Sequence, residues 1–277
     1  MSDKLIITVA TTGSITSREN HPDIPLHPKE IAQAVYECYQ AGAAMAHVHV
    51  RNDEGGPSMA IEKFRETVGL IREKCPIIIN LTSSGGRGIP LTDDDRICPI
   101  EELKPGMCSL DCGSLNFGDN RVFENHPKFL EKLATRARAA GVKPEIECFD
   151  IGMIENGVRM WKKGLLDGPL HFQFVMGVEG GISATIENLL FMRSKLPPDA
   201  TWSVIGIGKG HMPLMTTAMQ MGGHVRVGFE DNVFYHKGVL AKSNAQFVER
   251  TVRLAGEFNR PVATVEEAKK MLGLRQA

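Results

Sequence analysis

The sequence predicts an α/β protein built as one (β/α)8 barrel over residues 1–277, with an extra C-terminal helix. Short β-branched runs alternate eight times with longer amphipathic stretches. Strands separated by helices pair in parallel, because a crossover long enough to hold a helix returns the chain to the same side of the sheet. Eight such units in about 250 residues match the size of this barrel.

The predicted strands are short and bounded by turn residues, and they span residues 5–10, 45–51, 76–82, 108–113, 144–149, 170–176, 202–207 and 225–229. Helical periodicity is clearest over residues 28–42, 126–141 and 184–196, with a final helix from residue 265 that caps the barrel or joins subunits. A doubly wound open sheet is the alternative. It would need a glycine-rich first turn, whereas TTGSITSREN contains one glycine and no GxGxxG motif.

The composition limits the class of function. With 32 Lys and Arg against 33 Asp and Glu, the net charge is −1, which argues against a nucleic-acid partner. No apolar run approaches the roughly 18 to 20 residues of a membrane helix, and the first residues lack a signal-peptide pattern. Six cysteines without a CxxC pair indicate reduced thiols. We therefore expect a soluble, cytoplasmic protein that associates with neither nucleic acid nor membrane.

Polar side chains alternate with apolar ones on the second predicted strand, AHVHVR. His47, His49 and Arg51 share one face, and the apolar residues between them face the helices. Strands buried on both faces normally read as continuous apolar runs, so this pattern requires an explanation. Two histidines at i and i+2 can bind a divalent metal. The alternative is a pair of hydrogen-bonded core histidines.

Three other predicted strands also carry polar residues on one face. The fifth strand has Glu145 and Glu147, and the sixth has His171 and Gln173. The eighth has Arg226 and Glu230, with Asp231 just beyond its end. Unpaired ionisable groups in an interior cost several kcal/mol each, which a bound cation and an anionic substrate would offset. Barrel closure places the eighth strand near the second, so Glu230 can join His47 and His49. Two histidines and one carboxylate leave coordination positions open, as in catalytic zinc sites.

The segments HVHVR, RVGFEDN and KGVLAKSNAQFVER resemble the β-keto acid cleavage enzymes. The likeness extends from TVATTG to the SNAQFVER helix. It implies a zinc-dependent (β/α)8 enzyme that condenses a β-keto acid with acetyl-CoA, giving acetoacetate and a new acyl-CoA. It also suggests a homotetramer.

The resemblance also implies roles for individual residues. The positions that match are the metal ligands His47, His49 and Glu230, the charged catalytic pair Arg226 and Asp231, the active-site glutamate Glu145, and the substrate-binding hydroxyls Ser83 and Ser109. Alternatives stay open for three of them. Asp231 and Arg226 can form a structural ion pair, Glu145 can orient other groups, and Thr82 or Ser84 can replace Ser83, because a one-residue slip reverses the face.

Glycine-rich turns follow the sixth and seventh strands, at residues 177–182 and 206–214. Lys209, between Gly208 and Gly210, could meet a phosphate of acetyl-CoA near a helix start. Such turns are also common after any barrel strand.

The loop after the first strand bears on the substrate. The family member that acts on an amino-bearing keto acid has an acidic residue there, where this chain has Ser14 and Ile15. We expect Ser14 to contact a substrate whose distal part is apolar or uncharged, or anionic if Arg18 or Arg51 faces it. Two other classes of function remain open: a zinc-dependent aldolase or hydrolase on the same barrel, and a non-catalytic barrel that binds a small carboxylate.

Overall fold

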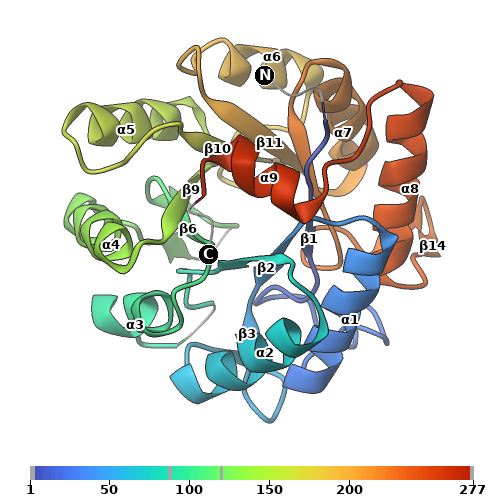
Figure 1. Cartoon of the computed structure of the whole chain (residues 1–277), viewed down its shortest axis with the longest axis horizontal. Coiled ribbons are helices and arrows are strands. Elements are labelled where there is room, and N and C mark those ends of the chain that lie inside the picture. The colour runs from blue at the N-terminus through green and yellow to red at the C-terminus, as the bar shows by residue number, and fades with distance from the viewer. Residues whose placement is uncertain (1–3, 87–88, 119–120, 275–277) are drawn as a thin grey trace.

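Eight parallel strands close into a barrel in the computed structural model, which describes residues 4–86, 89–118 and 121–274 (Figure 1). The strands of the barrel are β1 (Ile7–Ala10), β2 (Met45–Val48), β5 (Ile78–Leu81), β6 (Met107–Asp111), β9 (Lys143–Cys148), β10 (His171–Met176), β11 (Thr201–Gly206) and β12 (His224–Val227). Their order around the barrel follows the chain, and β12 closes it by pairing with β1. The predicted (β/α)8 barrel is confirmed.

Helices surround the barrel on its outer side (Figure 1). They are α1 (Pro28–Ala41), α2 (Ile61–Lys74), α3 (Asp93–Leu103), α4 (Pro127–Ala140), α5 (Ile151–Lys162), α6 (Ile186–Arg193), α7 (His211–Gln220) after the 3₁₀ turn η1 (Gly208–Gly210), and α8 (Asn244–Glu257). Residues at the caps fix where several helices begin and end. Helix α1 begins with Pro28 at its first position and stops at Gly42, whose φ of 114° suits glycine alone.

A last helix, α9 (Val265–Leu272), crosses the amino-terminal end of the barrel (Figure 1). Its buried Val265, Ala268 and Leu272 pack in one cluster with side chains from β2, β5 and β6, among them Met45 and Ile78. The final helix therefore covers the end of the barrel that lies away from the polar strand ends. Residues 275–277, which the sequence assigned to the same element, lie outside the described residues.

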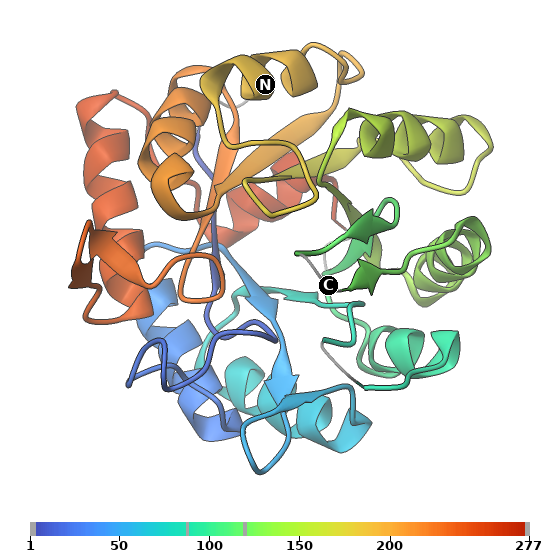
Figure 2. The same ribbon diagram turned by 180° about the vertical axis from the view of Figure 1, so that it is seen from behind.

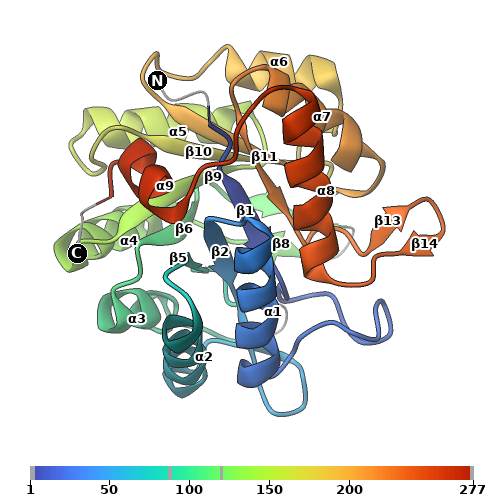
Figure 3. The same cartoon turned by 45° about the vertical axis from the view of Figure 1, so that its right-hand side comes forward.

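Three short hairpins follow barrel strands at the opposite, carboxyl-terminal end (Figures 2 and 3). They pair β3 (Val50–Arg51) with β4 (Pro57–Ser58), β7 (Leu115–Asn116) with β8 (Val122–Phe123), and β13 (Phe234–His236) with β14 (Val239–Leu240). The prediction of one continuous strand over residues 45–51 was wrong in this detail. The barrel strand ends at Val48, and the chain then turns into the first hairpin.

Two further sequence observations concern the whole chain. All six cysteines are free, and five of them are buried. Among the described residues, no helix combines the length and apolar character needed to cross a membrane.

Candidate active site

A cavity of about 140 Å³ opens among the carboxyl ends of the barrel strands. Active sites of such barrels are built at this end. The polar residues of its lining are Ser14, His47, His49, Thr82, Ser84, Ser109, Asp111, Arg121, Glu147, Arg226, Glu230 and Asp231. A larger cavity of about 540 Å³ near α9 includes none of the predicted site residues. The side chains that the sequence singled out therefore gather mainly in the smaller cavity.

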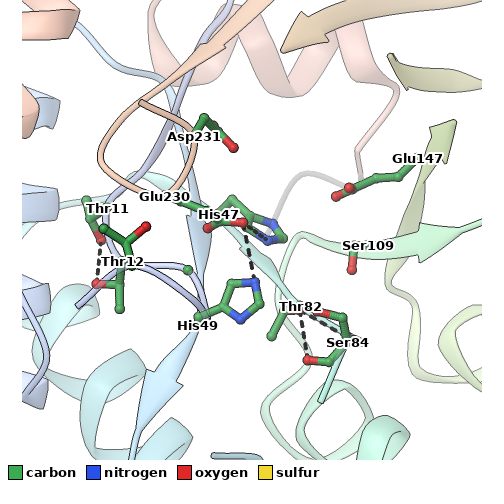
Figure 4. A network of polar contacts seen from close by, with 12 residues as sticks. Thr11, Thr12, His47, His49, Thr82, Ser84, Ser109, Glu147, Glu230 and Asp231 are labelled. Atoms are coloured by element: carbon green, nitrogen blue, oxygen red, sulfur yellow. Dashed lines mark hydrogen bonds and ion pairs between the residues drawn. The ribbon is translucent and has the colours of Figure 1, made fainter. Parts of the chain in front are cut away.

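His47, His49 and Glu230 converge on one point although they come from opposite ends of the chain (Figure 4). Their potential ligand atoms all lie within 4.8 Å of one another. The Nε2 atoms of His47 and His49 are 3.8 and 3.5 Å from Oε1 of Glu230. Closure through β1 causes this meeting, because β1 pairs with both β2 and β12.

The chemistry of these atoms fits a divalent cation. Burial, with a smaller effect of Arg226, lowers the pKa of His47 well below its usual value, so the imidazole is neutral and can be a ligand. Glu230 Oε2 and His47 Nδ1 are buried without a hydrogen-bond partner. Burial alone would raise the pKa of Glu230, but Arg226 and His49 hold it well below the usual value, which keeps the carboxylate ionised.

Arg226 stands between three carboxylates at the end of β12. Its Nε and Nη2 donate to the two oxygens of Asp231 at 3.0 Å each, and Nη2 also donates to Glu230 Oε1 at 2.5 Å. Nη1 lies 3.6 Å from Glu147 Oε1. One guanidinium therefore faces three acidic groups, and Asp111 lines the same cavity. Burial raises the pKa of Glu147 well above its usual value and that of Asp111 to about 6, and a bound cation would offset this cost of keeping several carboxylates ionised together.

Asp231 is held as a buried carboxylate with raised basicity. Burial raises its pKa to about 6, although Arg226 opposes this shift. A general base is most effective when its pKa is close to the working pH. The bidentate contact with Arg226 fixes the orientation of the carboxylate.

Two glycines bring the loop after β12 against the end of β1. The amide of Glu230 donates to Ala10 O, and Gly228 has a φ of 134° with no room for a side chain, since a Cβ would lie 2.2 Å from the same oxygen. Gly13 has a φ of 62°, and a Cβ on it would lie 2.5 Å from Cγ of Glu230. The position of the Glu230 side chain therefore depends on a bare backbone at Gly13.

We expect Gly13→Ala to displace Glu230 and weaken metal binding by about tenfold or more, the range seen when the surroundings of a ligand are disturbed. Competition with a chromophoric chelator measures this affinity. Gly222→Ala is the matched control: its φ is also positive, at 80°, but nothing lies within 4 Å of the new methyl group. Equal metal affinity in the two variants would contradict this prediction.

Glu145 lies deeper in the barrel than the sequence led us to expect. It is fully buried and absent from the cavity lining. Its Oε1 accepts from Asn80 Nδ2 at 2.6 Å, and its Oε2 lies 3.3 Å from His171 Nε2. Glu147, two residues closer to the carboxyl end of β9, reaches the cavity and Arg226 instead. Glu147 therefore occupies the cavity position that the resemblance implied for Glu145. Separately, Glu145, Glu147 and His47 form a second possible metal-binding group.

The serine-rich loop after β5 presents a different residue from the one chosen. Ser83 is fully buried behind the cavity, where its amide donates to Ser109 Oγ at 2.9 Å. Thr82 and Ser84 line the cavity, and their hydroxyls lie 3.0 Å apart (Figure 4). Ser109 lines it as predicted. Thr82 and Ser84, the two alternatives to Ser83, therefore occupy the cavity position that we expected of Ser83.

The other end of the cavity is mostly apolar, although the Arg121 guanidinium also lines it, 4.5 Å from the ring centre of Phe117. Phe117, Phe123 and Phe149 contact one another edge to face, with ring centroids 6.2 to 6.4 Å apart. Further apolar lining comes from Ile15, Val175, Val178, Ile205 and Ile207. Ser14 also lines the cavity, as predicted.

The two arginines that would have accommodated an anionic substrate are engaged elsewhere. Arg51 donates to four backbone carbonyls, including those of Gly13 and Thr16 at 2.8 Å. Arg18 pairs with Glu30 at 2.8 Å on the surface. Neither lines the cavity.

The glycine turn predicted to hold acetyl-CoA has structural reasons for its composition. The amide of Gly208 donates to Asn232 Oδ1 at 2.7 Å and so is already satisfied. A Cβ on Gly210 would lie 2.3 Å from that of Ala184. Lys209 is exposed and does not line the cavity, so these three residues are not brought together with the others.

Sequence reasoning missed Asp111 and the aromatic wall as parts of the site, and it placed Glu147 on an inward face without giving it a role. Glu147 shares a face with Glu145, and its position nearer the strand end was the signal that could have identified it. Asp111 lies two residues after Ser109 on the same face of β6, so the same alternation applied there. Phe117 and Phe123 flank a hairpin whose position no strand pattern predicted.

Comparison with known proteins bears on this geometry. The sequence profile described as beta-keto acid cleavage enzyme matches residues 4–274. The chain belongs to the β-keto acid cleavage enzyme family. One relative is a 3-keto-5-aminohexanoate cleavage enzyme of Fusobacterium nucleatum subsp. nucleatum. It is 45% identical to this chain over 276 residues, which cover 100% of both chains.

One further relative and one solved structure add to this comparison. A 3-oxoadipate:acetyl-CoA acetyltransferase of Cupriavidus necator is 39% identical over 277 residues, covering 99% of this chain and 96% of its own. The solved structure "Apo structure of ObcA" superposes with a TM-score of 0.80 over 91% of this chain and 66% of its own, at 18% identity, which supports the fold alone. The resemblance inferred from the sequence motifs is thus confirmed as family membership.

Proposed function

We propose that this protein is a zinc-dependent β-keto acid cleavage enzyme. It condenses a β-keto acid with acetyl-CoA and yields acetoacetate and the CoA thioester of the remaining acyl group. The observation that carries the proposal is the meeting of His47, His49 and Glu230 with Asp231 beside them, in a protein whose family and relatives bear this activity in their names. Acyl transfer also agrees with the relatives' use of acetyl-CoA in their names.

The reaction balances without an oxidant or any net proton. C2 of the β-keto acid loses a proton and forms a bond to the acetyl carbonyl, and CoA leaves as the thiol. CoA then adds to the original C3 carbonyl, the C2–C3 bond breaks, and the proton returns to C2. The products are acetoacetate and the new acyl-CoA.

His47, His49 and Glu230 would hold the zinc ion. When bound, a zinc ion supplies Lewis acidity that polarises a carbonyl and acidifies the adjacent C–H. Two nitrogens and one carboxylate oxygen form a donor set that zinc favours and that leaves room for substrate. The neutral state of His47 and the ionised state of Glu230 suit these roles.

Asp231 removes the C2 proton and later returns it. Arg226 orients the Asp231 carboxylate through two hydrogen bonds, and Glu147 contacts the far side of the guanidinium. We therefore assign to Glu147 the active-site role that the resemblance implied for Glu145. The buried setting excludes water from the base, which strengthens each of these electrostatic contacts.

The hydroxyls of Thr82, Ser84 and Ser109 bind the substrate carboxylate. They lie together on the β5 and β6 side of the cavity, across from Asp231 (Figure 4). Hydroxyl groups donate hydrogen bonds to a carboxylate without adding a fixed charge. Ser83 supports these hydroxyls, because its backbone amide donates a hydrogen bond to Ser109 Oγ.

The distal part of the substrate lies against the aromatic wall and Ile15. An ammonium group placed there would lose its hydration and meet an apolar surface, which is unfavourable without a counter-charge. The natural substrate is therefore a β-keto acid whose distal chain carries no ammonium group, and plain apolar or uncharged chains fit the aromatic wall best. Ser14 lies at the same edge and can accept a weakly polar group.

A substrate panel tests both the activity and this preference. Metal-loaded protein is incubated with acetyl-CoA and a set of β-keto acids, and new CoA esters are identified by mass. We expect plain β-ketoacyl chains to be cleaved with kcat/KM about tenfold or more above the 5-amino substrate, the discrimination that one unpaired buried charge supports. Preference for the amino substrate would refute the assignment of the distal pocket.

Ile15→Glu adds a variant to the same panel. A carboxylate at this cavity-lining position supplies the missing counter-charge, so the ratio of kcat/KM should shift toward the amino substrate. Ile186→Glu, which adds the same charge at an exposed position on α6, is the matched control and should leave the ratio unchanged. No new CoA ester with any β-keto acid would instead refute the proposed function itself.

Family membership favours acyl transfer over the other classes considered. A zinc-dependent aldolase or hydrolase would turn over without a thioester, and a non-catalytic carboxylate-binding barrel would show no turnover at all. The dependence of product formation on acetyl-CoA in the panel separates these three outcomes.

Three expectations stay predictions. Lys209 could still meet the distant phosphates of acetyl-CoA, since it is exposed at the carboxyl end of the barrel, but Gly208 and Gly210 have local reasons for being glycine. A homotetramer, suggested by the resemblance, is the second. A cytoplasmic location agrees with the six free cysteines.

A further inference from the structure

Arg96, in the first turns of α3, connects three segments that lie apart in the sequence. Its Nε donates to Ser83 O at 2.6 Å, Nη1 to Glu124 O at 3.1 Å, and Nη2 to Asn125 Oδ1 at 2.6 Å. Its guanidinium carbon lies 3.7 Å from the ring centre of Phe129 on α4. A side chain from the outer layer thus fixes a loop at the edge of the cavity.

Asn125 extends the connection to the end of β6. Its amide nitrogen Nδ2 donates to Gly113 O at 3.3 Å, and its backbone amide donates to Ser114 Oγ at 2.7 Å. Asn125 is 2% exposed, so water does not compete for these bonds. Arg96 therefore ties the loop after β5, which carries Thr82 and Ser84, to the loop that follows β6, the strand that carries Ser109.

The chemistry of these contacts is unusual for a charged side chain. All three acceptors of Arg96 are neutral oxygens, although hydrogen bonds from a buried guanidinium to carboxylates would be stronger. Burial lowers the pKa of Arg96, and among the charged groups Asp111 opposes this most. Asp111 lines the cavity, so the guanidinium also places positive potential behind the side where an anion would bind.

Ser83 is the point at which this connection reaches the cavity. Its carbonyl accepts from Arg96, and its amide donates to Ser109 Oγ at 2.9 Å. Its two neighbours, Thr82 and Ser84, line the cavity. A movement of the Ser83 backbone would therefore shift the hydroxyls of Thr82 and Ser84 and disturb the hydrogen bond that orients Ser109 Oγ.

We infer that Arg96 is a positioning residue for recognition of the substrate carboxylate: it fixes the backbone of Ser83 and thereby sets the hydroxyls of Thr82, Ser84 and Ser109. This inference rests on the proposed function, because those hydroxyls are taken to bind the carboxylate. The planar fork of arginine is essential to the role. A lysine has one nitrogen on a flexible chain and cannot span three separated acceptors.

Arg96→Lys and Arg96→Met test the inference. Both should raise the KM of the β-keto acid, and the Kd of acetoacetate measured by calorimetry without acetyl-CoA, by roughly ten- to a hundredfold, as expected when positioned groups move by about 1 Å. The kcat and the KM of acetyl-CoA should change by no more than about threefold, because Asp231 and the metal-binding trio lie on other strands. Arg96→Lys should resemble Arg96→Met, since the fork and not the charge is required.

Arg250→Lys is the matched control. Arg250 on α8 also donates to a backbone carbonyl, that of Tyr235 at 2.6 Å, and lies over an aromatic ring at 4.3 Å, but Tyr235 does not line the cavity and, among the residues that the structure describes, Arg250 makes no hydrogen bond with the hydroxyl-bearing segments. It should lower the unfolding temperature and leave the KM of the β-keto acid unchanged. A general loss of packing would instead move both arginine variants alike.

Several outcomes would overturn the inference. They are an Arg96→Lys variant with an unchanged KM, a fall in kcat that accounts for the whole effect, or an equal change in Arg250→Lys. If Arg96→Lys does not fold, Asn125→Ala decides, because it removes one acceptor of the fork and should raise the same KM. A parent protein that binds acetoacetate but forms no acyl-CoA would refute the proposed function and still leave the role of Arg96 measurable by calorimetry.

Discussion

Removal of the bound metal is expected to reduce the acetyl-CoA-dependent cleavage of a β-keto acid by about a thousandfold. Lewis-acid stabilisation of a developing charge is worth several kcal/mol, and roughly 4 kcal/mol corresponds to this factor. Dialysis against a chelator followed by a rate measurement gives the loss, and titration with zinc should restore the rate at one ion per chain. Protein that keeps its full rate after verified metal removal would contradict the proposed chemistry.

Glu230→Gln should produce the same loss by removing one ligand. Metal analysis after gel filtration should find substoichiometric metal in this variant, because two imidazoles alone bind zinc weakly. Glu147→Gln is the informative comparison. Glu147 belongs to the other possible group, His47 with Glu145 and Glu147, whose ligand atoms also lie within 4.8 Å of one another.

The two variants therefore distinguish two positions for the ion. Retention of metal by Glu147→Gln and its loss from Glu230→Gln would support the site at His47, His49 and Glu230. The opposite result would move the ion deeper into the barrel and away from Asp231. In that case the proposed role of Asp231 beside the metal would fail with it.

The meeting of His47 with Glu230 could be predicted because it follows from topology. Barrel closure makes β12 and β2 both neighbours of β1, whatever the side chains are. Strand alternation then decides which side chains point inward. Ser109, which was named from the resemblance alone, also lines the cavity.

The choices of Glu145 and Ser83 came from the resemblance, and the structure places neither side chain in the cavity lining. Glu145 and Glu147 share a face of β9, and Glu147, which lies nearer the carboxyl end of the strand, is the one that reaches the cavity. At Ser83 the strand has already ended, since β5 stops at Leu81, so the alternation used there no longer applied. Thr82 and Ser84 are placed instead by their own hydrogen bonds in the loop.

The remaining features depend on loop geometry, which no local pattern encodes. Arg51 reads as a third inward residue of one strand, but the strand ends at Val48, and the guanidinium turns to the carbonyls of the loop after β1. The partners of Arg96 lie 13 to 29 residues away in the sequence. Hydrogen bonds of this kind appear only once the loops are folded against each other.

Asp231→Asn is expected to lower kcat by roughly a hundred- to ten-thousandfold, the contribution usual for a positioned general base. The amide cannot accept the C2 proton, while its size and one hydrogen bond to Arg226 are kept. Metal content should stay at the parent value, because Asp231 is outside the metal-binding trio. Deuterium exchange at C2 of acetoacetate in D₂O, without acetyl-CoA, measures the proton-transfer step alone.

The exchange measurement also decides between the catalytic role and a structural ion pair of Asp231 with Arg226. A purely structural pair predicts a lower unfolding temperature and an exchange rate unchanged apart from any loss of folded protein. A catalytic base predicts the reverse: folded, metal-loaded protein that no longer catalyses exchange. Asp150→Asn is the matched control, because Asp150 caps α5 through its side chain and asparagine caps a helix equally well. Since the oxygens of Asp231 both accept from a guanidinium that also contacts Glu230 and Glu147, loss of one charge there should be tolerated structurally, and the defect should appear in proton transfer.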